Sequence, residues 1–156
     1  LIKRAEEYYK TTGSYIFSSY LEHEKQDKTR FIGNTGPWEW MASFAPEGFY
    51  EIWGIIPGIT SFQQVTEEDW LNLARGVLNT QKFYRSLNRN SCNLGILSYE
   101  TNESVLEIRV ILIVRSNYTA WTRNDYTGFE IALGDMTTFS APEETAELAR
   151  PFWDGH

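Results

Sequence analysis

Side chains suited to nucleophilic or metal chemistry are scarce in this sequence. Its two histidines are His23 and His156, and its single cysteine is Cys92. His23 lies in the stretch LEHEKQDK, whose composition predicts a solvated loop, and His156 is the last residue. This set has no spacing for structural zinc, for a Cys/His nucleophile pair or for a Ser-His-Asp triad. We therefore expect no catalytic residue and no metal ligand among them.

Glycines and carboxylates supply no further motif. The glycines form neither a G-x-G-x-x-G pattern nor a P-loop, so we expect no phosphate cradle and no cofactor. The acids cluster as AEE, EHE, TEED and PEETAE at predicted helix starts or in loops, where capping and solubility account for them. A carboxylate pair for acid–base chemistry is the alternative, although the sequence places no two carboxylates in an apolar setting.

Charge and hydropathy exclude several classes of partner. The 14 basic and 21 acidic residues leave a net charge of −7, which would repel the phosphate backbone of a nucleic acid. The longest apolar run, Val110–Val114, is far below the ~20 residues that cross a bilayer, so we expect no membrane partner and a cytoplasmic location. With 156 residues, 42% of them hydrophobic, the chain fits a single packed domain spanning residues 1–156.

Hydrophobic periodicity and turn residues divide the chain into helices and short strands. Helices are expected at 2–13, 66–88 and 140–151. Strands are expected at 30–35, 38–44, 49–56, 93–99, 105–116 and 127–133. This order predicts an α+β domain with a mostly antiparallel sheet of five to six strands and a long helix packed across it.

Local signals predict further details of the helices and strands. Thr66 with Asp69, and Ser140 with Glu143, have the spacing of capping boxes. Gly76 inside the long helix indicates a close contact with the sheet. Aromatic residues alternate with small or apolar ones on the strands, which favours core packing over the alternative, a stacking surface for bases or sugars. These aromatic residues are Trp38, Trp40, Phe44, Tyr50 and Trp53.

Five blocks of the sequence, taken in order, are similar to one half of a known enzyme family. They are EEYYKTTG leading into SYLEHE, WEWMASFAPEGFYEIWGIIP, TEEDWLNLARGVL, NLGILS, and TGFEIALG followed by APEETAELAR. In this order the chain resembles, nearly end to end, the second half of galactose-1-phosphate uridylyltransferases and of relatives such as ADP-glucose phosphorylases. The resemblance implies a histidine-triad-like fold. It also implies that the nucleophilic histidine belongs to the other half, while this half supplies scaffold, part of the sugar site and the subunit contact.

The resemblance further implies metal-ligand positions that this sequence does not fill. Relatives carry histidine after the strand ending IIP and after a later turn, where Gly58–Thr60 and Leu97 stand here. Some carry C-x-x-C at the positions of Tyr15 and Ser18. Relatives also carry histidines in the following strand, where the nearest residues here are Leu106, Ile108 and Arg109. We therefore expect the metal site of this half to be missing.

One substrate contact is also implied by the resemblance. A G-Y-E turn of the uridylyltransferases contacts hexose hydroxyls, and Gly128, Phe129 and Glu130 match it. Glu130 would accept hydrogen bonds from a sugar, whereas Phe129 lacks the phenolic oxygen. Asn124 stands near a family lysine without its charge, which argues against a phosphate contact there. A solvent-facing strand residue is the alternative for Glu130.

These observations leave functional hypotheses of different classes. In the first, the chain is the C-terminal-half type of a nucleotidyltransferase acting on sugar nucleotides and hexose 1-phosphates, inactive alone, with a second copy or an N-terminal half as partner. In the second, it is a stand-alone, non-enzymatic module that binds a sugar, a nucleotide or a protein. Sequence upstream of Leu1, which is not an initiator methionine, would separate them. An enzyme using an unrecognised residue is disfavoured, because a covalent nucleotidyl intermediate needs an imidazole-like nucleophile.

Overall fold

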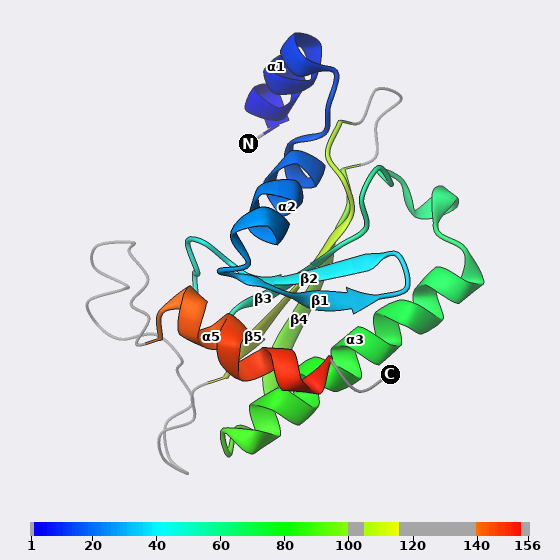
Figure 1. Cartoon of the computed structure of the whole chain (residues 1–156). Helices are drawn as coiled ribbons and strands as arrows, with labels where there is room; N and C mark the ends of the chain where they lie inside the picture. Colours follow the sequence, from blue (N-terminus) through cyan, green and yellow to red (C-terminus); the bar gives the residue numbers. More distant parts are fainter. Residues whose placement is uncertain (1, 100–104, 116–139, 154–156) are drawn as a thin grey trace, which may run out of the picture.

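The computed structural model describes residues 2–99, 105–115 and 140–153 as helices around an antiparallel sheet (Figure 1). The described helices are α1 (Ile2–Thr12), α2 (Ile16–Asp27), α3 (Glu67–Ser86) and α5 (Pro142–Ala149), with short 3-10 turns η1 (Phe62–Gln64) and η2 (Arg150–Phe152). The strands are β1 (Phe31–Thr35), β2 (Trp38–Ala42), β3 (Ile52–Ile55), β4 (Cys92–Leu97) and β5 (Arg109–Val114). The predicted α+β class is confirmed, and the strand predicted at 127–133 lies outside the described residues.

The strands form one sheet in the order β1-β2-β3-β5-β4, with antiparallel neighbours. β5 lies between β3 and β4, and its residues alternate between buried and half-buried. The even-numbered ones, Val110, Leu112 and Val114, belong to the core under α3, so Arg109, Ile111 and Ile113 point to the opposite face. This alternation separates the two faces on which the rest of the molecule is built.

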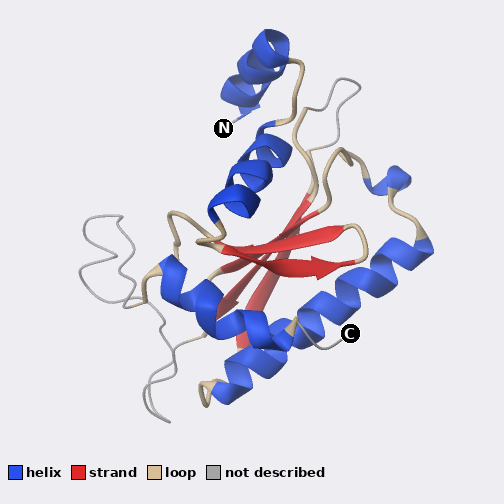
Figure 2. Cartoon of the chain, in the orientation of Figure 1, coloured by secondary structure: helices blue, strands red, loops and turns tan. Residues whose placement is uncertain are grey.

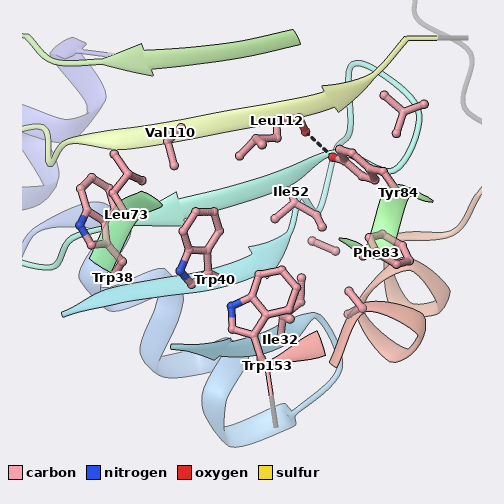
Figure 3. Packing of buried hydrophobic residues seen from close by; sticks show 14 of the residues in the cluster. Ile32, Trp38, Trp40, Ile52, Leu73, Phe83, Tyr84, Val110, Leu112 and Trp153 are labelled. Atoms are coloured by element: carbon pink, nitrogen blue, oxygen red, sulfur yellow. Dashed lines mark hydrogen bonds between the residues drawn. The ribbon is translucent and has the colours of Figure 1, made fainter. Parts of the chain in front are cut away.

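One face of the sheet is closed by α3 and α5, which lie next to each other across it (Figure 2). Trp38 and Trp40 are fully buried there, and the Trp38 indole N–H donates to the Asp69 carbonyl oxygen of α3 at 2.8 Å. The Tyr84 hydroxyl lies 3.1 Å from the Leu112 carbonyl oxygen of β5, to which it donates (Figure 3). Aromatic residues that carry one polar atom each therefore tie the helix to the strands while filling the core.

The predicted close contact at Gly76 is confirmed. A Cβ atom at this position would lie 1.9 Å from Cζ2 of Trp40, far inside van der Waals contact. Glycine is therefore the residue that lets α3 approach the sheet closely enough to cover the Trp40 ring. The predicted capping box of α3 is also present, since Thr66 and Asp69 each bond the other's backbone N–H.

The opposite face is partly covered by α1 and α2. Phe17 and Leu21 of α2 are buried with Met41 of β2 and Ile55 of β3. Phe17 also meets the Trp53 ring edge to face, with ring centroids 6.2 Å apart. This second cluster is smaller than the core under α3.

Three local predictions are wrong. The stretch around His23 is helical, in α2, although His23 is exposed as expected. Phe44 is not a core residue: it is 64% exposed, and the Arg30 guanidinium lies over its ring. The Ser140–Glu143 capping box is absent, because α5 begins after Ala141 without a side-chain cap and the Glu143 carboxylate pairs with Arg30 at 2.8 Å.

In the part of the chain that the structure describes, every helix is too short or too polar to span a lipid bilayer.

Candidate functional site: a buried carboxylate at the start of α2

Glu107 lies just before β5 and is 2% exposed. Its Oε2 accepts the backbone N–H groups of Phe17 and Ser18, both at 3.0 Å. Its Oε1 accepts the Ser18 hydroxyl and, at 2.9 Å, the Gly58 N–H. Each carboxylate oxygen thus has two donors, so the buried charge is fully hydrogen-bonded by residues from two other parts of the chain.

The carboxylate acts as the cap of α2. The first backbone N–H groups of a helix have no partner within it, and Tyr15, the residue before α2, makes no side-chain cap. Glu107, 90 residues away from Phe17, satisfies two of these N–H groups. A negative charge at this end is also favoured by the helix dipole. The cap is therefore tertiary, and it anchors α2 to the sheet.

The same carboxylate holds the turn after β3. Gly58 has a φ of +76°, a conformation that glycine adopts without strain, and this turns its N–H toward Glu107. The turn is also bonded to the segment of Glu107 itself, since the Ile108 N–H donates to the Ile59 carbonyl oxygen at 2.8 Å. One side chain therefore connects α2, the turn after β3 and the start of β5.

Positions that the resemblance assigns to metal ligands come together here. Ser18 and Gly58 bond the Glu107 carboxylate directly. The pKa of the Tyr15 phenol is raised by burial, then by Tyr9, and in part by the negative charge of Glu107. Leu97 of β4 faces Arg109 in the register with β5. Segments that are distant in the sequence thus meet at one end of the sheet.

The donor set at this place does not fit a transition metal. It offers one carboxylate, a hydroxyl, a phenol and a backbone amide, whereas zinc and iron sites are built from imidazole, thiolate or several carboxylates. Both oxygens of Glu107 are already occupied by hydrogen-bond donors. Throughout residues 2–99, 105–115 and 140–153, no three His, Cys, Asp or Glu side chains are grouped closely enough to hold a metal ion.

Arg109 is the cation of this site. Its guanidinium carbon lies 5.0 Å from the centre of the Phe17 ring and 4.5 Å from that of Trp53, so it is held by both rings. Burial lowers the pKa of Arg109, with Glu51 and Glu47 acting in the opposite direction. No salt bridge of Arg109 is found among the described residues. A stacked guanidinium without a paired carboxylate retains its capacity to bind an anion such as a phosphate.

A second buried carboxylate, Glu51, lies at the other end of β3. Its Oε2 accepts the Glu47 N–H at 2.7 Å, and its Oε1 accepts the indole N–H of Trp53. Burial raises the pKa of Glu51, and these hydrogen bonds offset the rise only in part. Glu51 and Glu107 have separate sets of partners, so the described contacts do not make them an acid–base pair.

The predicted sugar-binding residues lie outside the part of the chain that the structure describes, as does His156; they are Asn124, Gly128, Phe129 and Glu130. Sequence reasoning missed the role of Glu107. Its signal was present, since Glu107 is the one acidic residue in the otherwise apolar run Val105–Ile108 and adjoins the implied ligand positions.

Comparison with known proteins finds one distant relative by sequence and several solved structures with a similar fold. No protein-family model matches the chain. An uncharacterized protein of Archaeoglobus fulgidus (strain ATCC 49558 / DSM 4304 / JCM 9628 / NBRC 100126 / VC-16) is 26% identical over 147 residues, which cover 94% of this chain and 44% of the relative. The chain thus spans less than half the length of this curated relative.

Solved structures that match the chain include a uridylyltransferase and an ADP-glucose phosphorylase. A uridylyltransferase superposes with a TM-score of 0.75 at 13% identity, covering 97% of this chain and 48% of that one. An ADP-glucose phosphorylase from Arabidopsis thaliana with bound ADP-glucose gives 0.71 at 22% identity, covering 94% and 46%. The resemblance drawn from the sequence is confirmed at the level of the fold, which matches about half of each enzyme.

A protein that this chain matches over most of that protein's length shares the architecture as well. A zinc-bound histidine triad family protein from Mycobacterium smegmatis superposes with a TM-score of 0.57 at 13% identity, covering 86% of this chain and 91% of that one. The fold of this chain is therefore histidine-triad-like.

Proposed function

We propose that this chain is the C-terminal-half type of a uridylyltransferase-like nucleotidyltransferase, a half that supports the fold and binds the sugar nucleotide but supplies no nucleophile. The observation that carries the proposal is the match of nearly the whole chain to about half of a uridylyltransferase. Glu107 adds chemical support. Its carboxylate fills the place of the implied metal ligands with hydrogen bonds between chain segments.

The described part of the proposed binding site is Arg109. Its guanidinium is stacked between two rings, which fixes its position, and a diphosphate group suits such a planar cation. The sugar would be contacted by Glu130, with Gly128, Phe129 and Asn124 beside it, as the resemblance implies. The sugar nucleotide is thus proposed to bind through one cation and one carboxylate.

The first experiment is a transfer assay. The 156-residue chain is incubated with UDP-glucose and galactose 1-phosphate, or with ADP-glucose and phosphate, and the products are separated by chromatography. We expect turnover no higher than in buffer, because an exposed His23 on α2 has no pocket in which to hold a nucleotidyl group. Turnover that the His23→Ala change abolishes would overturn the proposal.

The second experiment measures binding by calorimetry with UDP-galactose, ADP-glucose and free galactose. We expect Arg109→Met and Glu130→Gln each to weaken sugar-nucleotide binding by about tenfold, the loss of one charge-assisted hydrogen bond. Free galactose should respond to Glu130→Gln alone. Glu147→Gln, an exposed change on α5, serves as the matched control and should leave the affinity unchanged. Equal affinities for all four proteins would contradict the assignment.

A further inference from the structure

A small cavity lies where α3 ends and β4 begins, and we call it the α3–β4 cavity. Its volume is about 80 Å³, and its lining runs from the last turns of α3 to Cys92, the first residue of β4. Among the described residues that line it are two arginines, Arg85 and Arg89, and no carboxylate. An apolar cavity known to hold a benzene ring measures about 150 Å³. The α3–β4 cavity therefore suits a group of a few atoms rather than a base or a sugar.

The reversal of the chain after α3 brings the two arginines together. Asn88 has a φ of +60°, the left-handed conformation that commonly ends a helix. The Arg89 N–H then donates back to the Tyr84 carbonyl oxygen at 2.9 Å. Arg89 thus returns to the last turns of α3, near Arg85, and both residues line the same cavity.

The surrounding sequence favours an anion because its charged residues are all basic. The chain has 21 acidic residues, yet residues 70–99 contain no Asp and no Glu. The basic residues of this stretch are Arg75, Lys82, Arg85 and Arg89. Charges of one sign raise the local potential, even in a chain whose net charge is −7. No salt bridge of Arg85 is found among the described residues, so its charge can act on a bound anion.

The C-terminal end of α3 acts against an anion, but only weakly. A helix C-terminus corresponds to about −0.5 charge, whereas each guanidinium group carries a full positive charge. Three of the last carbonyl oxygens of α3 also accept backbone N–H groups of the residues after the helix, at 2.9–3.3 Å, and they belong to Phe83, Tyr84 and Arg85. The two arginines therefore determine the sign of the field in the cavity.

Neutral groups complete the described lining. Gln81, Asn90 and Ser91 carry an amide or a hydroxyl, each of which can donate a hydrogen bond to an oxyanion. Cys92 is half-buried, and burial raises the pKa of its thiol, which keeps the sulfur uncharged near neutral pH. The described lining thus offers an anion cations and neutral donors, without a like charge.

The α3–β4 cavity lies away from Arg109. β4 pairs with β5 from Cys92, opposite Val114, to Leu97, opposite Arg109. The cavity adjoins the first of these pairs and Arg109 belongs to the last, so the two lie at opposite ends of the strands. An anion in the cavity would be bound independently of a diphosphate at Arg109.

We propose that the α3–β4 cavity binds one phosphate-sized oxyanion between the guanidinium groups of Arg85 and Arg89. Planar guanidinium groups can donate pairs of parallel hydrogen bonds to such an anion. The ligand is inorganic phosphate, or the phosphoryl group of a small phosphomonoester whose remainder stays in solvent, since Arg85, Asn90 and Ser91 are exposed. The inference goes beyond the proposed function and does not depend on it, because it rests on the other end of the sheet.

The binding test is calorimetry on the 156-residue chain with inorganic phosphate. We expect binding at millimolar or lower concentration. Arg85→Gln and Arg89→Gln should each weaken it by about tenfold, the loss of one charge-assisted hydrogen bond. The thermal midpoint of each variant shows that it is folded.

Arg75→Gln is the matched control. It removes the same charge from α3, but Arg75 is outside the cavity lining and ten residues before Arg85. Ten residues of helix span about 15 Å, which exceeds the Debye length of about 10 Å, so the affinity should change by less than about twofold.

Galactose 1-phosphate as a second ligand distinguishes the two sources of the phosphoryl group. Equal affinities for this ester and for phosphate, both reduced by Arg85→Gln, would show that the phosphoryl group alone is recognised. A higher affinity for the ester, reduced in the same way, would identify a phosphomonoester as the ligand.

Cys92 gives a second, local measurement, because it is the single cysteine of the chain and lines the cavity. Its alkylation by iodoacetamide can be followed by mass spectrometry. Millimolar phosphate should slow the reaction at least about threefold, since the rate falls by a factor of 1 + [L]/Kd when the occupied cavity excludes the reagent. Chloride at the same ionic strength should give no protection, and Arg85→Gln should remove most of that given by phosphate.

Absence of phosphate binding at millimolar concentration would overturn the proposal. So would binding that Arg85→Gln and Arg89→Gln weaken no more than Arg75→Gln, or alkylation of Cys92 that phosphate does not slow.

Discussion

The face of the sheet under α3 is closed by large apolar side chains, whereas the face under α2 is closed around a buried carboxylate. The first is held by contacts of many atoms, among them the fully buried rings of Trp38 and Trp40. The second combines a smaller apolar cluster with the four hydrogen bonds of Glu107. Apolar packing tolerates small adjustments of position, but a buried charge is stable only while every donor remains in place. The two faces should therefore respond differently to mutation.

The strongest test of the apolar face is Trp40→Ala. Removing this buried ring leaves a cavity beneath Gly76, and we expect a loss of about 3–5 kcal/mol in the free energy of unfolding. Urea denaturation measures it, and protection from hydrogen exchange should fall throughout the sheet and α3. Phe44→Ala is the control: it also removes an aromatic ring from the sequence block WEWMASF, but Phe44 is 64% exposed, so the change should stay near 0.5 kcal/mol. Similar losses for both variants would contradict the described packing.

The corresponding test of the polar face is Glu107→Gln. The carboxylate accepts four hydrogen bonds, two at each oxygen. In glutamine an NH2 group replaces one oxygen and would face two of these donors without accepting from them. We therefore expect a loss of about 3 kcal/mol in the free energy of unfolding. The loss should be local as well as global. Amide exchange is expected to accelerate most at Phe17, Ser18 and Gly58, while α3 stays protected.

Glu22→Gln, on the exposed side of α2, is the matched control for Glu107→Gln. The Glu22 carboxylate pairs with Lys25 at the surface, at 2.8 Å. Exposed ion pairs contribute little to stability, so we expect the free energy of unfolding to change by less than about 0.5 kcal/mol. If Glu107→Gln were equally mild, the carboxylate would not be the anchor of α2. If α3 lost its protection as readily as α2, the two faces would not be distinct in this respect.

A smaller, pH-dependent effect is expected from Glu51. Its pKa in the folded chain is raised above the ordinary value of 4.5 by burial, so the folded state binds this proton more tightly than the unfolded state. Stability from this group is therefore complete below pH 4.5 and is lost as the pH rises through the raised pKa. The difference in unfolding free energy between the wild type and Glu51→Gln, measured from pH 4 to pH 8, should shift against the wild type as the pH rises. A flat difference would mean that burial does not penalise this carboxylate.

The smallest expected effect is that of a chelator. Because hydrogen bonds to Glu107 join the segments where a metal would be ligated, EDTA should leave the thermal midpoint of the purified chain unchanged. Elemental analysis should find less than stoichiometric zinc or iron. One equivalent of either metal, together with a lower midpoint after chelation, would show that the end of α2 is anchored differently from the description given above.

The elements of the apolar face could be predicted from the sequence because their signals are local. Alternating aromatic and branched residues gave β1, β2 and β3, and Thr66 with Asp69 placed the start of α3. Helix α2 was missed, since its polar surface resembles a loop and its cap comes from Glu107, 90 residues further along the chain. No window of the sequence contains both partners. The meeting of Ser18, Gly58 and Glu107 depends on the folded sheet, which is why it could not be derived from spacing.

The close approach at Gly76 has a consequence for the outside of the molecule. Only the hydrogen atom of Gly76 separates the α3 backbone from the Trp40 ring. The close packing at this point fixes the rotation of the helix about its own axis relative to the sheet. Any bulkier residue at this buried position would lift α3 from the sheet or rotate it about its axis. Either movement would change the direction in which Leu71 and Leu78, exposed on its far side, point into the solvent. The orientation of the exposed leucines is thus governed from within the core, by the one residue of the helix that has no side chain.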